Sequence, residues 1–182
     1  MKSTMRIFAG ALGAFLLATA GARAAEPPPP LAAPTLAASD KLTLQKLHDG
    51  NQTQSQMGKL AQDKGSTRAV RDFGRRLAND ATVAERKIDE YLRTRGTDLT
   101  ALATTTSADS DHELLATKVG LDFDRLFAQQ ISSDLQDTVD LLGSARVETA
   151  DDTLRLLYDE LSRTVNADKK AADDLLTGMT RS

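Results

Sequence analysis

The distribution of prolines constrains the fold of this chain more than any other feature of its sequence. All five prolines lie between Pro27 and Pro34, and residues 35–182 contain none. At average usage, a stretch of that length would hold about seven. Turns in β-rich folds use proline freely, whereas the interiors of long helices exclude it. Its absence therefore favours long helices and argues against a loop-rich β fold.

Apolar residues recur every three or four positions in four long segments, which is the pattern of helices with one buried face. The predicted long helices cover residues 41–64, 67–95 and 121–146, with a last helix from about 152. The second has Ser66 or Thr67 as its cap, Gly96 as its stop, and an apolar stripe that includes Val70, Phe73 and Leu77. A short helix is predicted over 110–119, where Ser110 and Glu113 have the spacing of a capping box. The predicted fold is all-α: an antiparallel four-helix bundle with a short extra helix in the long central connection.

Residues 1–24 have the form of a secretory signal peptide. Lys2 and Arg6 give a basic start, residues 7–20 are apolar, and Ala22 and Ala24 place small side chains before a cleavage point. The apolar stretch is shorter than the roughly 20 residues that span a bilayer, which argues against a membrane anchor. We expect cleavage after Ala24, export to the bacterial periplasm, and no membrane span in the mature chain.

The chain divides into three predicted parts. The signal peptide at 1–24 is followed by a Pro/Ala-rich segment, 25–39, predicted to be a disordered tether, and by a helical bundle domain over 40–178. Loss of the signal peptide removes three basic residues, so the mature chain is more acidic than the full-length net charge of −3. With this charge and only 4% aromatic residues, we expect no nucleic-acid partner.

Residues that commonly carry catalysis or bind metals are scarce. The chain has no cysteine, which excludes disulfides and thiolate metal sites. We interpret His48 as an exposed residue in a polar stretch, and His112 as part of the capping-box turn. No Glu-x-x-His pair, glycine-rich phosphate loop or Ser/His/Asp group can be assembled. We therefore predict no catalytic, cofactor-binding or metal-binding residues and do not expect an enzyme.

The middle of the first predicted helix allows two interpretations. Asn51 and Gln54 continue its apolar stripe, so they either form a buried polar network or face water on a turned helix.

The second predicted helix is rich in basic residues, whereas the last two helices are acidic. We interpret the basic helix as a solvent-facing helix that lies beside acidic neighbours and guides the packing order. Its basic residues are Arg68, Arg71, Arg75, Arg76, Arg86, Lys87, Arg93 and Arg95.

Three segments resemble those of the bacterial domain-of-unknown-function family 4142, exported proteins with a ferritin-like four-helix bundle. They are Met57-Gly-Lys-Leu-Ala61, residues 70–80, and Gly120-Leu-Asp-Phe-Asp-Arg-Leu-Phe127. The third is the most specific, because the family has Gly, two small or apolar residues, Phe-Asp, and an aromatic residue four positions after the Phe. The resemblance covers residues 42–176 and implies a ferritin-like bundle.

The resemblance also implies that the family's metal-type residues are substituted in this chain. The glutamate position of the first helix is Gln54, and the histidine positions fall at Ala81, at Leu135, and at or near Ala167. A metal site there would need carboxylates or imidazoles. Three aspartates adjoin these positions, each about 100° away around its helix; they are Asp80, Asp134 and Asp168.

Three functional hypotheses follow. The leading one is an exported, non-catalytic helical-bundle protein without a cofactor, which is structural or binds an unidentified protein partner in the bacterial envelope. The alternative is a ferritin-like metal-binding protein that uses Asp80, Asp134 and Asp168 with His48. The third is that Ala81, Ala84 and Ala167 leave an apolar cavity for a lipid-like ligand.

Overall fold

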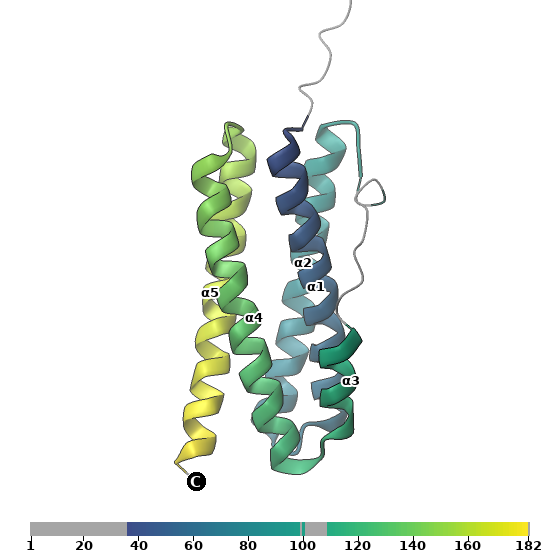
Figure 1. Cartoon of the computed structure of the whole chain (residues 1–182), viewed down its shortest axis with the longest axis vertical. Helices are drawn as coiled ribbons and strands as arrows, with labels where there is room; N and C mark the ends of the chain where they lie inside the picture. The colour runs from purple at the N-terminus through teal and green to yellow at the C-terminus, as the bar shows by residue number, and fades with distance from the viewer. Residues whose placement is uncertain (1–35, 99, 101–108, 182) are drawn as a thin grey trace, which may run out of the picture. The chain divides into compact units, whose positions relative to one another are not determined.

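Four long helices and one short helix make up the described part of the chain (Figure 1). The computed structural model describes residues 36–98, 100 and 109–181. The helices are α1 (Ala38–Lys64), α2 (Arg68–Thr94), α3 (Asp109–Thr117), α4 (Gly120–Glu148) and α5 (Asp152–Thr180). None of these residues forms a strand, which confirms the all-α prediction.

Local capping signals account for several helix ends. The side chain of Thr67 accepts a hydrogen bond from the N–H of Val70 at the start of α2, as the sequence predicted. Asp151 caps α5 in the same way. Gly96 follows α2 with a φ of 71°, in the left-handed region that glycine adopts without strain. The predicted stop at Gly96 is therefore confirmed.

The first helix begins earlier than its predicted start at residue 41. It starts at Ala38, and Asp40 in its first turn is buried. The Thr149 hydroxyl, in the link between α4 and α5, donates a hydrogen bond of 3.1 Å to Asp40. This contact holds the first turn of α1 against the rest of the bundle. The predicted signal peptide and residues 25–35 of the predicted tether lie outside the described residues, as do the side chains of Ser110 and His112.

The long helices pack as two hairpins, α1 with α2 and α4 with α5. The hairpins meet where α1 packs on α4 and α2 on α5. The end of α2 lies beside the start of α5, because Arg95 pairs with Asp151. The start of α4 lies at the opposite end, where Asp124 contacts Ser66. The end of α2 and the start of α4 therefore lie at opposite ends of the bundle, so these two helices run in the same direction.

The core consists of two separate apolar clusters, one toward each end of the bundle. We call them the Tyr158 cluster and the Phe127 cluster. The Tyr158 cluster contains Leu44, Leu47, Ile88, Tyr91, Leu92, Leu142, Ala145, Leu154, Leu157, Tyr158 and Leu161. The Phe127 cluster contains Met57, Ala61, Val70, Phe73, Leu77, Leu115, Phe123, Phe127, Ile131, Leu135 and Ala172. Among the described helices, none is both long and apolar enough to cross a membrane.

A pair of glycines brings the backbones of α1 and α2 into direct contact. A Cβ atom added to Gly58 would lie 2.6 Å from the carbonyl oxygen of Gly74, and one added to Gly74 would lie 2.6 Å from that of Gly58. Real Cβ atoms do not approach backbone atoms this closely. Both positions therefore require glycine, and the two helices can pack this tightly only because neither has a side chain there.

A buried aspartate joins the start of α4 to the turn between α1 and α2. The carboxylate of Asp124 accepts hydrogen bonds from the backbone N–H groups of Ser66 (2.8 Å) and Thr67 (2.9 Å). It also accepts one from the Ser66 hydroxyl at 2.7 Å. Asp124 is fully buried, so these three donors provide the partners that its carboxylate needs away from water.

Candidate functional site in the middle of the bundle

A layer of polar side chains separates the two apolar clusters. Asn51 and Gln54 are only 8% and 6% exposed, so the amides in the middle of α1 face the interior. This result favours the buried polar network over a helix turned toward water. We call the whole group the polar layer. Its members are His48, Asn51 and Gln54 from α1, Arg76, Asp80 and Glu85 from α2, Thr138 from α4, and Thr164 and Asp168 from α5.

His48 belongs to this layer, so its interpretation as an exposed residue was wrong. It is 8% exposed, and its Nδ1 lies 2.6 Å from a carboxylate oxygen of Glu85 on α2. Asn51 donates a hydrogen bond of 2.8 Å to the other oxygen of the same carboxylate. The side-chain amide of Gln52 lies 2.7 Å from the second ring nitrogen of His48. Glu85 was not singled out in the sequence, because its contact with His48 depends on how α1 and α2 are aligned.

On the α5 side of the layer, Arg76 binds Asp168. The Nε and Nη2 atoms of Arg76 lie 2.9 and 2.6 Å from the same carboxylate oxygen of Asp168. Asp168 is only 3% exposed. Asp80 lies 3.9 Å from the same guanidinium group. Burial raises the pKa of the Asp168 carboxyl; the hydrogen bond and charge of Arg76 oppose this rise, and the charge of Asp80 adds to it.

Basic side chains of α2 pair with acidic side chains of α5 where the two helices pack together. Besides Arg76 with Asp168, Lys87 pairs with Glu160 at 2.5 Å, and Arg95 pairs with Asp151. Basic α2 therefore lies beside an acidic neighbour, as we predicted. These pairs are distributed along the contact between the two hairpins, and each gains from having a partner of opposite charge.

The polar layer encloses a small cavity beside Gln54. Its volume is about 20 Å³, enough for one water molecule. Its lining includes Gln54, Ala81, Thr164 and Asp168. No hydrogen bond joins the Gln54 side chain to another residue that the structure describes, although this residue is 94% buried. The side-chain amide of Gln54 therefore needs a partner other than a described residue. The cavity that it lines has room for one water molecule that bridges it to the neighbouring polar groups.

We expect replacement of Gln54 with leucine to stabilise the fold. The change removes a buried amide that has no described protein partner and keeps a similar volume, which should raise the free energy of unfolding by about 1 kcal/mol. The matched change Asn51→Leu should lower it by about 1 to 2 kcal/mol, because Glu85 loses a hydrogen-bond donor. Urea unfolding measures both. Destabilisation by Gln54→Leu equal to that by Asn51→Leu would show that Gln54 also makes a stabilising contact.

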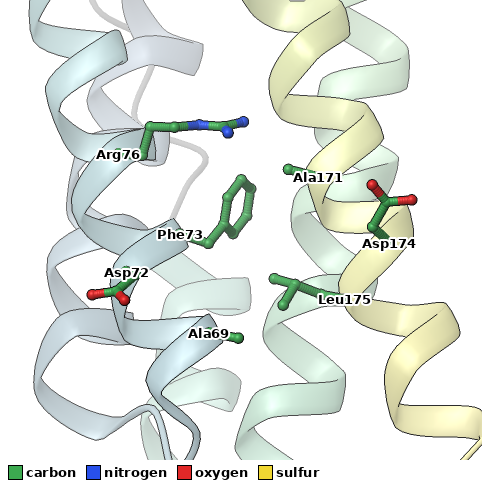
Figure 2. A pocket seen from close by; sticks show the side chains of 7 residues that line it. All are labelled: Ala69, Asp72, Phe73, Arg76, Ala171, Asp174 and Leu175. Carbon is green, nitrogen blue, oxygen red and sulfur yellow. The ribbon is translucent and has the colours of Figure 1, made fainter.

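A second concave feature lies between α2 and α5, outside the polar layer. It is an open groove of about 420 Å³. Figure 2 shows the Phe73 ring projecting from α2 toward α5, where it faces Ala171 and Leu175. The floor of the groove belongs to the Phe127 cluster, whose partly buried members include Ala171, Leu175 and Met179. Three charged side chains complete the lining; they are Asp72, Arg76 and Asp174.

Comparison with known proteins supports the resemblance seen in the sequence. Residues 25–175 match the model of a family described as a domain of unknown function, DUF4142. The chain belongs to this family. Comparisons with curated proteins and with solved structures give no significant match.

The segments that carry the DUF4142 resemblance have clear structural roles. Gly58 and Gly74 form the close contact between α1 and α2. Asp124, in the Phe-Asp step of the third segment, anchors α4 to the preceding turn. Phe127, four residues after Phe123, stacks on it with ring centroids 6.1 Å apart. In this chain, these residues of the DUF4142 segments therefore contribute to packing.

The four positions at which the sequence resemblance implied substituted metal ligands do not all face the interior. Gln54, Ala81 and Leu135 are buried, but Ala167 is exposed, and the buried residue at this level of α5 is Asp168. Asp168 therefore takes the inward position that the resemblance placed at or near Ala167. The reason is geometric, since adjacent residues lie about 100° apart around a helix.

The residues of the metal-binding hypothesis do not come together as a cluster. Asp80 and Asp168 both lie beside the Arg76 guanidinium group, whereas His48 pairs with Glu85. Asp134 is half-buried on α4. Within the described ranges, no group of three or more His, Asp or Glu side chains is arranged to hold a metal ion.

The three alanines that were predicted to leave an apolar cavity for a lipid-like ligand do not line a common cavity. Ala81 and Ala84 line the cavity beside Gln54, but Ala167 does not. At about 20 Å³, that cavity is much smaller than the roughly 300 Å³ or more of typical ligand pockets. The expectation of a lipid-sized cavity at these three alanines was therefore wrong.

Proposed function

We propose that this protein is an exported, non-catalytic helical bundle of the bacterial envelope that binds a protein partner through the groove between α2 and α5. Export rests on the signal-peptide pattern at residues 1–24. The observation that carries partner binding is a groove of about 420 Å³ at the edge of the Phe127 cluster, lined by the buried Phe73 ring and the half-buried Leu175. A partner that covers this edge would remove the remaining exposed area of Leu175 from water, which is favourable.

The shape of the groove favours a helical partner segment. Its two walls are the antiparallel helices α2 and α5, and it follows their direction from Ala69 to Arg76 on α2 and from Ala171 to Leu175 on α5. A third helix that places an apolar stripe between two such walls would extend the packing of the bundle.

The charges on the walls define the chemistry of the partner further. Asp72 on α2 and Asp174 on α5 border opposite sides of the groove, with side chains 49% and 67% exposed. Asp72 pairs with Arg75, and Asp174 pairs with Lys170, both near the surface. Exposed pairs of this kind contribute little free energy, so a partner can replace them at low cost. We therefore propose an amphipathic helix with basic residues on both sides of its apolar stripe.

Replacement of Leu175 with glutamate should abolish partner binding, because it places a charge in the apolar floor of the groove. A photo-crosslinking residue at Ala69 should capture a defined periplasmic protein that the Leu175→Glu variant fails to capture. The matched control is Leu156→Glu, since Leu156 lies on the same helix, is 69% exposed and is absent from the groove lining. This variant should retain capture.

The same experiment tests export and the location of the docking site. Cell fractionation should recover the protein from the periplasm with Ala25 as its first residue. A crosslinker at the exposed residue Ser144 on α4 should not capture the partner. Equal capture from Ser144 and Ala69, or unchanged capture by Leu175→Glu, would refute the groove as the docking site. Recovery only from the cytoplasm, with an uncleaved N-terminus, would refute export.

A further inference from the structure

A separate polar groove lies between α1 and α2, next to the polar layer. Its volume is about 260 Å³. Amide and hydroxyl side chains form its walls; they come from Gln52, Ser55 and Gln56 on α1 and Thr82 on α2. Aromatic and large aliphatic side chains are absent from the described lining, so a ligand here must be polar rather than lipid-like.

Glu85 places a fixed negative charge in one wall of this groove. Its two carboxylate oxygens are held by His48 and Asn51, at 2.6 and 2.8 Å. These contacts leave 20% of the side chain exposed, and Glu85 lines the groove. A carboxylate oxygen has more than one acceptor site, so Glu85 can also accept a hydrogen bond from a ligand. Because both oxygens are already held, the carboxylate would need little reordering to bind a cation.

Lys59 supplies the opposite charge farther along the groove. It is exposed and makes no ion pair with any residue that the structure describes. Asn51, which contacts Glu85, and Lys59 are about 12 Å apart along α1, at 1.5 Å per residue. The lysine side chain can cover roughly 6 Å of this distance. A ligand that lies along the groove, beside both groups, would therefore carry its two charges roughly 6 Å apart, close to the length of two extended residues.

We propose that this groove binds a zwitterionic peptide of about two residues. The peptide's ammonium group donates to Glu85, and its carboxylate accepts from Lys59. Gln52 and Gln56 lie one helical turn apart between these ends. The Gln52 amide nitrogen contacts His48, so Gln52 offers its oxygen to the peptide group, whereas the Gln56 amide can both donate and accept. This site shares no lining residue with the groove between α2 and α5, so it can exist whether or not the partner-binding proposal holds.

Calorimetric titration of the purified protein with alanyl-alanine tests this proposal. We expect saturable binding that weakens at least tenfold when either charge of the peptide is removed. Two derivatives serve this purpose: the N-acetylated peptide lacks the ammonium group, and the C-terminal amide lacks the carboxylate. Equal binding of the free and blocked peptides would overturn the assignment of charges, and no saturable binding up to about 10 mM peptide would overturn the site itself.

A lysine variant separates specific binding from general attraction to the protein surface. Lys59→Met should weaken alanyl-alanine binding at least tenfold without changing the circular dichroism spectrum, because Lys59 is exposed and makes no described ion pair. The matched control is Lys46→Met, which removes another exposed lysine of α1 outside the groove. It should bind like the unmodified protein. Equal binding by the two variants would refute the role of Lys59.

Discussion

Replacement of Gly58 with alanine is expected to lower the free energy of unfolding by about 3 kcal/mol, near the upper end of the usual cost of overpacking. The new Cβ would lie 2.6 Å from the carbonyl oxygen of Gly74 and 2.9 Å from the backbone nitrogen of Ala78. Both are backbone atoms of α2, so the clash can be relieved only if the two helices move apart. Gly74→Ala should have a similar effect, because its Cβ would meet the backbone of α1 at the same distance.

The same substitution at Gly50 provides a matched control. Gly50 is also within α1, but an added Cβ there meets no atom within 4 Å. Gly50→Ala should stabilise the protein by about 0.5 to 1 kcal/mol, because alanine is a better helix former than glycine. Urea unfolding followed by circular dichroism compares the variants. If Gly58→Ala is as stable as Gly50→Ala, the close contact between α1 and α2 does not exist.

Removal of the Arg76 side chain as Arg76→Met should destabilise the fold by about 2 to 3 kcal/mol at neutral pH. This is below the roughly 3 to 5 kcal/mol for fully buried pairs, because Arg76 is 46% exposed. The cost arises because Asp168 stays buried, loses its cation and still faces the charge of Asp80. Adding Asp168→Leu removes the buried charge, so the double variant should recover most of the loss.

The loss in Arg76→Met should depend on pH, with a definite sign. Burial and Asp80 raise the pKa of Asp168, and only Arg76 opposes them, so this pKa rises further in the variant. The folded-state pKa then lies above the unfolded value of 3.8, and the folded state takes up a proton first. Stability of Arg76→Met relative to the unmodified protein should therefore increase as the pH falls through the raised pKa.

The neighbouring arginine is a control for the general effect of removing a basic residue. Arg75 makes a surface pair with Asp72, with 66% of its side chain exposed. Arg75→Met should change the free energy of unfolding by less than about 0.5 kcal/mol and show no added pH dependence. Equal losses in Arg76→Met and Arg75→Met would show that the ion pair with Asp168 contributes no more than a surface pair.

Much of the fold could be predicted from the sequence because helix signals are local. The three- and four-residue spacing of apolar positions located the four long helices, and most of the predicted stripe on α2 is buried, including Val70, Phe73 and Leu77. Thr67 and Gly96 marked the ends of α2, because capping depends on residues within one turn. The signal peptide and residues 25–35 of the tether remain predictions, since they lie outside the described residues.

The candidate sites could be predicted only in part. The amides Asn51 and Gln54 were visible as an interruption of an apolar stripe, but their burial depended on which face of α1 meets the other helices. The partner of His48 is Glu85, which lies 37 positions away in the chain. The inward residue of α5 at the polar layer is Asp168 rather than Ala167, a difference of one position.

The sequence alone determined the helical class, the order of the helices, the family and the presence of a polar interruption in α1. These properties depend on neighbouring residues or on motifs read along the chain. Only the tertiary structure decided that His48 pairs with Glu85, that Arg76 neutralises Asp168, and that grooves open between α1 and α2 and between α2 and α5. Those features depend on the alignment and rotation of whole helices, which are set by contacts between residues far apart in the chain.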